Sequence, residues 1–312
     1  MPFARAVSPA GLSSFFEICD TGPDGRPLSD LELVGARGGG FTLNAGIETV
    51  VEVKEADRTE VRIRINGQEH EARTTRAVVE EILSLDGRNY LVEVYHTIPV
   101  PMACGFGTSA AGALTAALAL SAALDLKLTY NQLGRMAHAA EIKCKTGLGT
   151  VGPLMLGGPC IITVEPGGPG RALIDKIPAP KDLKVISGVF GPIETREVLV
   201  RTAGKDRINS AGRKALEAIL DDPCLEVFME ACRQFALESG LSTARTRALM
   251  EALRSEGLYC AQNMIGEAVH AIARDEEELA KALAVFRRFL PEANIYVLDA
   301  CWKPAELVKV GR

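Results

Sequence analysis

The sequence predicts an α+β protein built from two domains. Its 312 residues exceed the usual size of one domain, and 47% of them are hydrophobic, which is enough for ordinary cores. In the first half, short alternating runs typical of strands precede a glycine-containing loop and an apolar helix. In the second half, a series of helical segments is interrupted by few strands, which is typical of an α+β layer. A linker rich in glycine and proline divides the domains, which we expect at residues 1–165 and 171–312.

The elements of the first half follow from apolar spacing and turn signals. Two alternating runs precede Asn66-Gly67, a pair typical of hairpin turns, and Thr129 with Gln132 has the spacing of a capping box. The expected elements are a loop and short strand at 8–18, a glycine-rich turn ahead of a strand at 35–41, strands at 49–53, 61–65, 90–95 and 157–164, and helices at 76–85, 110–124 and 129–143.

The second half is expected to be mainly helical. Its expected elements are strands at 183–190 and 294–300, helices at 210–220, 224–238, 243–255 and 275–289, and an apolar run at 267–273.

The loop before the helix at 110–124 has the chemistry of an anion site. Residues 101–111 read Pro-Met-Ala-Cys-Gly-Phe-Gly-Thr-Ser-Ala-Ala. Gly105 and Gly107 permit backbone conformations closed to other residues and leave room for a ligand, while Thr108 and Ser109 occupy the expected N-cap. The helix is apolar or small on every side, so we expect it to be buried and its N-terminus to be held still. Free N–H groups and the helix dipole favour phosphate there, and a plain structural turn is the weaker alternative.

Charge and cysteine usage exclude several classes of function. The formal charge is −5 and the isoelectric point is near 5.6, so nucleic acid is not an expected partner. Eight cysteines are scattered without a Cys-x-x-Cys pair, and four histidines lack zinc spacing. Reduced thiols in a cytoplasmic protein are expected. The N-terminus has no apolar run, so we expect neither a signal peptide nor a membrane anchor.

A second glycine run needs a separate explanation. Residues 147–152 fit Gly-x-Gly-x-x-Gly, the fingerprint of dinucleotide-binding folds. That fingerprint follows a strand and opens a helix, whereas this run follows a helix and meets Pro153. The context therefore disfavours a dinucleotide site.

The loop at 101–111 resembles the phosphate loop of the GHMP small-molecule kinases, with Phe106 and Thr108 in place of the commonest Leu and Ser. Residues 8–18 and 35–41 are similar to the corresponding segments of the archaeal pantoate kinases. The resemblance implies a two-domain GHMP architecture, with an N-terminal half like ribosomal protein S5 domain 2 and a ferredoxin-like C-terminal half. It also implies transfer of phosphate from ATP to the primary hydroxyl of pantoate, giving 4-phosphopantoate for coenzyme A synthesis.

The resemblance further implies roles for individual residues. ATP would be held by Pro101, Gly105, Phe106, Gly107, Thr108, Ser109 and Ala110. Ser109 and Glu141 would be the catalytic pair and would hold Mg²⁺. Pantoate would be bound by Ser8, Glu17, Arg37, Gly147 and Thr150, with the Arg37 guanidinium suited to a carboxylate. From the residues alone, Glu17 could equally be a solvated loop carboxylate. A helix-surface carboxylate ranks second for Glu141, and a flexible turn remains the alternative for the Arg37 segment.

Two departures from the family leave alternatives open. Thr150 stands where pantoate kinases commonly have Asp, and a hydroxyl cannot be a strong base, so the general base stays unassigned. The third GHMP motif, at 262–267, has one glycine where several are usual. A GHMP kinase for homoserine, shikimate or mevalonate remains an alternative, as does a nucleotide-binding regulator without transfer activity. A homodimer is also left open.

Overall fold

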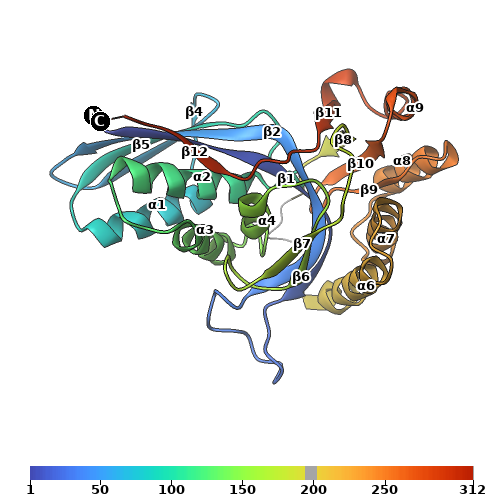
Figure 1. The fold of residues 1–312 in the computed structure, drawn as a ribbon, viewed down its shortest axis with the longest axis horizontal. Coiled ribbons are helices and arrows are strands. Elements are labelled where there is room, and N and C mark those ends of the chain that lie inside the picture. The colour runs from blue at the N-terminus through green and yellow to red at the C-terminus, as the bar shows by residue number, and fades with distance from the viewer. Residues whose placement is uncertain (194–201, 312) are drawn as a thin grey trace.

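The computed structural model describes residues 1–193 and 202–311. They form two β-sheets, an eight-stranded sheet and a four-stranded one, with helices packed against both (Figure 1). The large sheet contains β1 (Phe3–Cys19), β2 (Gly35–Glu55), β3 (Glu60–Ile65), β4 (Gln68–Glu69), β5 (Tyr90–Thr97), β6 (Ile161–Glu165), β7 (Leu173–Lys176) and β12 (Glu306–Gly311). The small sheet contains β8 (Lys184–Gly191), β9 (Cys260–Gln262), β10 (Glu267–Ala273) and β11 (Ile295–Asp299).

The helices fall into two groups along the chain, as Figure 1 shows. The first group is α1 (Arg73–Asp86), α2 (Thr108–Ala123), α3 (Tyr130–Cys144) and α4 (Val151–Leu156), and the second is α6 (Thr202–Asp221), α7 (Leu225–Glu238), α8 (Ala244–Ser255) and α9 (Glu276–Phe286), followed by the 3₁₀ turn η1 (Glu292–Asn294). The predicted α+β class is confirmed, since the sheets and helices form distinct layers. In the part of the chain that the structure describes, no helix is long and apolar enough to cross a bilayer.

The large sheet is ordered β12-β1-β2-β5-β3-β4, and β6 extends it by pairing with β2 and β7. Both chain ends meet at its edge, where Phe3 pairs with Gly311 (Figure 1). Two strands, β7 and β12, come from beyond the expected division at 165–171. The first sheet is therefore completed by later chain, and the division into domains stays a prediction.

Two expectations about the first strands were wrong. The expected short strand at 8–18 and the glycine turn at 35–41 are parts of the long paired strands β1 and β2. Side chains at Gly38 and Gly40 would overlap the carbonyls of Phe15 and Leu12, so glycine there permits close strand pairing rather than a turn. The Asn66-Gly67 turn joins β3 to β4 in a hairpin. The two alternating runs that precede it, in β2 and β3, are not paired with each other, because β5 lies between these strands.

Helix α2 is the centre of the first helical group. Every residue from Ala110 to Ser121 is buried, as the sequence predicts for a helix without a polar face. The small side chains let β1, β2, α1 and α3 all pack closely against it. Burial on all sides holds the N-terminus of α2 in a fixed position.

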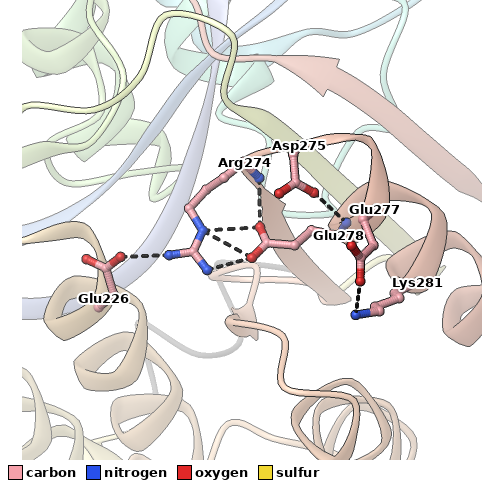
Figure 2. A network of polar contacts seen from close by, with 6 residues as sticks. All are labelled: Glu226, Arg274, Asp275, Glu277, Glu278 and Lys281. Carbon is pink, nitrogen blue, oxygen red and sulfur yellow. Dashed lines mark hydrogen bonds and ion pairs between the residues drawn. The ribbon is translucent and has the colours of Figure 1, made fainter.

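A surface ion-pair network connects α9 and the turn before it to α7 (Figure 2). Arg274 donates to Glu278 on α9 and, at 2.9 Å, to Glu226 on α7. Asp275 caps α9 by accepting from the Glu278 N–H at 2.8 Å, and Lys281 pairs with Glu277. These contacts fix the junction between β10 and α9 against α7.

Candidate active site

A cavity of about 620 Å³ lies where the phosphate-loop segment, β1, β2 and the chain after α3 meet. The lining residues that the sequence singled out are Arg37, Gly105, Phe106, Gly107, Thr108, Ser109, Glu141, Gly147 and Thr150. Three expected contributors, Ser8, Glu17 and Pro101, are not part of the lining, and neither is the buried Ala110. Most of the expected site residues thus share one cavity.

The N-terminus of α2 opens into this cavity without a side-chain cap. Gly107 is the N-cap, with φ 61° and ψ 26°, and no side chain accepts from the first turn at that cap. The expected capping role of Thr108 and Ser109 was wrong, because both residues already lie within the helix. The Ser109 hydroxyl instead donates to Glu141. The N–H groups of the first turn therefore remain available to an anion.

The two glycines of the loop allow close packing against neighbouring segments of the protein, and they do not leave empty space for a ligand. A Cβ at position 105 would lie 2.7 Å from the Cβ of Asn263, and one at position 107 would lie 2.7 Å from the carbonyl oxygen of Gly11. Both positions have positive φ, 80° and 61°. The loop is also bonded to β1, since the Gly11 N–H donates to the Phe106 carbonyl at 3.0 Å. The glycines hold the loop close to its neighbours, while its helical end faces the cavity.

Ser109 and Glu141 form the polar pair at the cavity wall. The Ser109 hydroxyl donates to Oε1 of Glu141 at 2.7 Å, and Oε2 is buried without a hydrogen-bond partner among the described residues. Burial raises the pKa of Glu141 to about 7, against a smaller lowering by the Ser109 hydrogen bond. A Cβ at Gly147 would lie 2.5 Å from Oε1, so the glycine lets the backbone close over the carboxylate. Glu141 is not the helix-surface carboxylate of the alternative interpretation.

The second charged feature of the cavity is Arg37. Arg37 lines the cavity, and its guanidinium lies 2.6 Å from Glu17, the residue paired with it across β1 and β2. Glu17 also accepts from Arg213 of α6 at 2.7 Å, and it is buried rather than solvated in a loop. Ser8 lies outside the cavity lining, and its hydroxyl donates to the carbonyl of the neighbouring Pro9 at 3.0 Å.

Thr150 lines the cavity beside the loop, and its methyl group packs against Gly107 and Gly11. Its Cγ2 would lie 2.8 Å from a Cβ at Gly107 and 2.9 Å from one at Gly11. The methyl group thus fills the space between the loop and β1. Thr150 supplies no carboxylate to the cavity.

Two networks of buried polar side chains, each built around a histidine, could not be predicted from the sequence. His270 of β10 lies 3.0 Å from Oδ1 of Asn263 and 3.2 Å from the hydroxyl of Ser14 on β1. Burial lowers the pKa of His270 to about 3, so the ring is neutral, donates to Asn263 and accepts from Ser14. Asn263 in turn donates to Ser187 at 2.9 Å and to the Cys104 carbonyl at 3.4 Å. The turn at 262–267 therefore braces the loop from behind.

The other network reaches the cavity, because His96 and Thr75 belong to its lining. His96 on β5 lies 2.7 Å from the hydroxyl of Thr49 and 3.0 Å from that of Thr75. Burial lowers the pKa of His96 to about 4, so this ring is also neutral. Isolated histidines and threonines on strands and helices carry no motif, and only the fold brings them together.

Known proteins resemble this chain in sequence and in fold. Residues 72–158 match the family model of the GHMP kinases N terminal domain. A pantoate kinase from Thermococcus kodakarensis is 34% identical over 290 residues, covering 89% of this chain and 91% of the relative. A pantoate kinase from Methanocaldococcus jannaschii is 28% identical over 289 residues, covering 93% and 99%.

A solved structure agrees over the whole length. It is described as a phosphotransferase related to the CoA biosynthesis pathway, is 28% identical, superposes with a TM-score of 0.84 and is covered to 99%, as is this chain. The predicted two-domain GHMP fold is thereby confirmed at the level of architecture. The chain therefore belongs to the GHMP kinases and, within them, to the family of the pantoate kinases.

Proposed function

We propose that this protein transfers the γ-phosphoryl group of ATP to the primary hydroxyl of pantoate, giving 4-phosphopantoate for coenzyme A synthesis. One observation carries the proposal. The uncapped N-terminus of α2, the Ser109–Glu141 pair and Arg37 line the same cavity. An anion site, a pair of oxygen ligands and a carboxylate-binding cation are the three parts that phosphorylation of a hydroxy acid requires. The names of the relatives support pantoate as the acid.

The donor atoms at the cavity wall fit a magnesium ion. Mg²⁺ prefers oxygen ligands and is commonly held by one or two carboxylates, with phosphates and water supplying the rest. Glu141 offers an unpaired buried oxygen, and Ser109 offers a hydroxyl 2.7 Å from the other oxygen. When bound, Mg²⁺ would neutralise phosphate charge. Among the described residues, no cluster of three acidic, cysteine or histidine side chains competes as a metal site.

The residues of the chain then have separate tasks in the transfer. N–H groups at the start of α2 bind phosphate oxygens and stabilise the charge on the transferred group. Arg37 binds the carboxylate of pantoate and so orients its hydroxyl toward the phosphorus. A bond forms between the hydroxyl oxygen and phosphorus, the bond to the β-phosphate oxygen breaks, ADP leaves, and the proton of the hydroxyl is released to water. Because such transition states are loose, positioning supplies most of the catalysis, and Thr150 need not act as a base.

The proposal is tested by turnover with a panel of acceptors. We expect ADP release with ATP, Mg²⁺ and pantoate, with 4-phosphopantoate identified by mass spectrometry, and at least about 100-fold less turnover with homoserine, shikimate or mevalonate. The double variant Ser109→Ala, Glu141→Gln should lose at least about 100-fold in kcat. A matched control is Ser84→Ala with Glu80→Gln, an exposed pair on α1. Pantoate turnover that survives the first double variant would defeat the site assignment.

A regulator that binds nucleotide without transferring phosphate is the second candidate. The observation in its favour is Thr150, which fills the place of the family's Asp with a packed methyl group. Calorimetry that detects ATP binding, together with no phosphorylation of any acceptor in the panel, would favour this candidate over a kinase.

A further inference from the structure

The carboxylate of Glu17 bridges two arginines that come from different elements. Nη2 of Arg37 on β2 lies 2.6 Å from Oε2, and Nη1 of Arg213 on α6 donates to Oε1 at 2.7 Å. The Glu17 side chain is only 6% exposed, whereas those of Arg37 and Arg213 are 35% and 48% exposed. Two guanidinium groups thus share one carboxylate, and the cluster carries a formal charge of +1.

The two arginines face different surroundings. Arg37 lines the cavity, whereas Arg213 and Glu17 lie outside its lining. If residue 213 carried no charge, the ion pair of Glu17 with Arg37 would have no net charge beside the cavity. With Arg213 bound to Oε1 of Glu17, one positive charge is left over, and of the two arginines only Arg37 belongs to the cavity lining. A carboxylate in the cavity would be attracted to that excess charge.

The position of Arg213 is set by the docking of α6 on β1. Asn209 accepts from the N–H of Ile18 at 2.8 Å and donates to its carbonyl at 3.0 Å. A side chain at Gly212 would overlap the carbonyl of Phe16, so glycine permits the helix to approach the strand. Asn209, Gly212 and Arg213 lie three and four residues apart, on one helical face. The contacts of α6 with the backbone of Phe16 and Ile18 therefore place the Arg213 side chain beside the carboxylate of Glu17.

We infer that Arg213 is a positioning residue that sets the affinity for the acidic acceptor. By binding Glu17 from outside the cavity, it keeps part of the Arg37 charge uncompensated, and that charge binds the carboxylate of the substrate. The inference deepens the proposed function and rests on it. Nothing in this role touches the phosphate loop, so the binding of nucleotide should be independent of Arg213.

The test compares Michaelis constants for the two substrates. In Arg213→Gln we expect the KM for pantoate to rise about tenfold, with kcat and the KM for ATP within about twofold of wild type. Arg213→Lys keeps the charge and should recover most of the affinity for pantoate. The control is Lys214→Gln, the next residue of α6, which pairs at the surface with Glu238 and should leave both constants unchanged. Thermal unfolding of each variant checks that the fold is retained.

The possible results separate this inference from the function it depends on. Absence of pantoate turnover by the wild-type protein would overturn the proposed function. Normal wild-type turnover with an unchanged KM for pantoate in Arg213→Gln would overturn the inference alone. So would an equal rise in the KM for ATP, an equal effect of Lys214→Gln, or no recovery in Arg213→Lys.

Discussion

At the residue scale, Glu141 combines a structural cost with a proposed functional role. Its carboxyl group is buried beside Ser109 and Gly147, and burial raises its pKa from an ordinary value of 4.5 to about 7. A carboxyl group whose pKa is higher in the folded state favours folding when it is protonated. That contribution is complete below about pH 4.5 and is lost as the pH rises through 7. The protein keeps an unfavourable buried carboxylate where a cation would compensate it.

This cost predicts a pH-dependent gain in stability for Glu141→Gln. The neutral amide keeps the shape and can accept from Ser109, so the variant and wild type should be similarly stable at pH 5. At pH 8, without metal or nucleotide, the variant should be more stable by up to about 3 kcal/mol. Urea denaturation in EDTA at both pH values measures the difference. Glu80→Gln, at an exposed position on α1, is the control, and an equal gain at pH 5 and pH 8 would contradict the prediction.

At the element scale, the phosphate loop depends on the turn at 262–267. The two backbones approach each other where each has a glycine, since a Cβ at Gly266 would lie 2.5 Å from the carbonyl carbon of Cys104 and one at Gly105 would meet Asn263. Asn263 and the neutral ring of His270 fill the polar space behind the contact. The single remaining glycine of the third motif therefore has a defined packing function.

Gly105→Ala tests this contact against a matched glycine. Gly67 has nearly the same φ, 82° against 80°, but an added Cβ there would contact nothing within 4 Å. Both substitutions should cost about 1–2 kcal/mol for the left-handed backbone alone. We expect Gly105→Ala to cost more, because the methyl group displaces Asn263, and to raise the KM for ATP, which Gly67→Ala should leave unchanged. Equal unfolding free energies from urea titrations and equal KM values would show that the contact has no such role.

At the scale of the whole molecule, the cavity joins parts of the chain that lie far apart in sequence. Arg37 comes from β2, Glu141 from α3 and the bracing turn from the small sheet. A nucleotide that binds this cavity in the folded state alone should stabilise the entire protein.

We therefore expect ATP with Mg²⁺ to raise the melting temperature. At a concentration 100 times Kd the stabilisation is about 2.7 kcal/mol, which corresponds to about 5–10 °C for a protein somewhat smaller than this one. Scanning fluorimetry with and without EDTA measures the shift, and the double variant Ser109→Ala, Glu141→Gln should lose its Mg²⁺-dependent part. A shift of the same size in that variant would place the nucleotide elsewhere.

Local patterns were sufficient for much of the fold. The helix at 110–124 was predictable because small and apolar side chains on all sides leave it no face for water, and the structure buries Ala110 to Ser121. The strand at 35–41 was not predictable, because its glycines allow close pairing with the backbone of β1, whereas glycines in a sequence usually indicate a turn. Thr108 and Ser109 were mistaken for caps, because the left-handed Gly107 starts the helix one residue earlier.

The spacing and residue types of 101–111 predict an anion site, and the resemblance to the GHMP kinases adds Glu141 as an expected metal ligand; both roles stay predictions. Pairings across long separations do not leave such a signal. The Glu17 carboxylate became a bridge only when β2 and α6 brought Arg37 and Arg213 to it, and Asn263 reached the loop only through the pairing of β10 with β8 and β9. The physical reason is that burial and electrostatic interaction depend on distance in space, which the chain sets by folding.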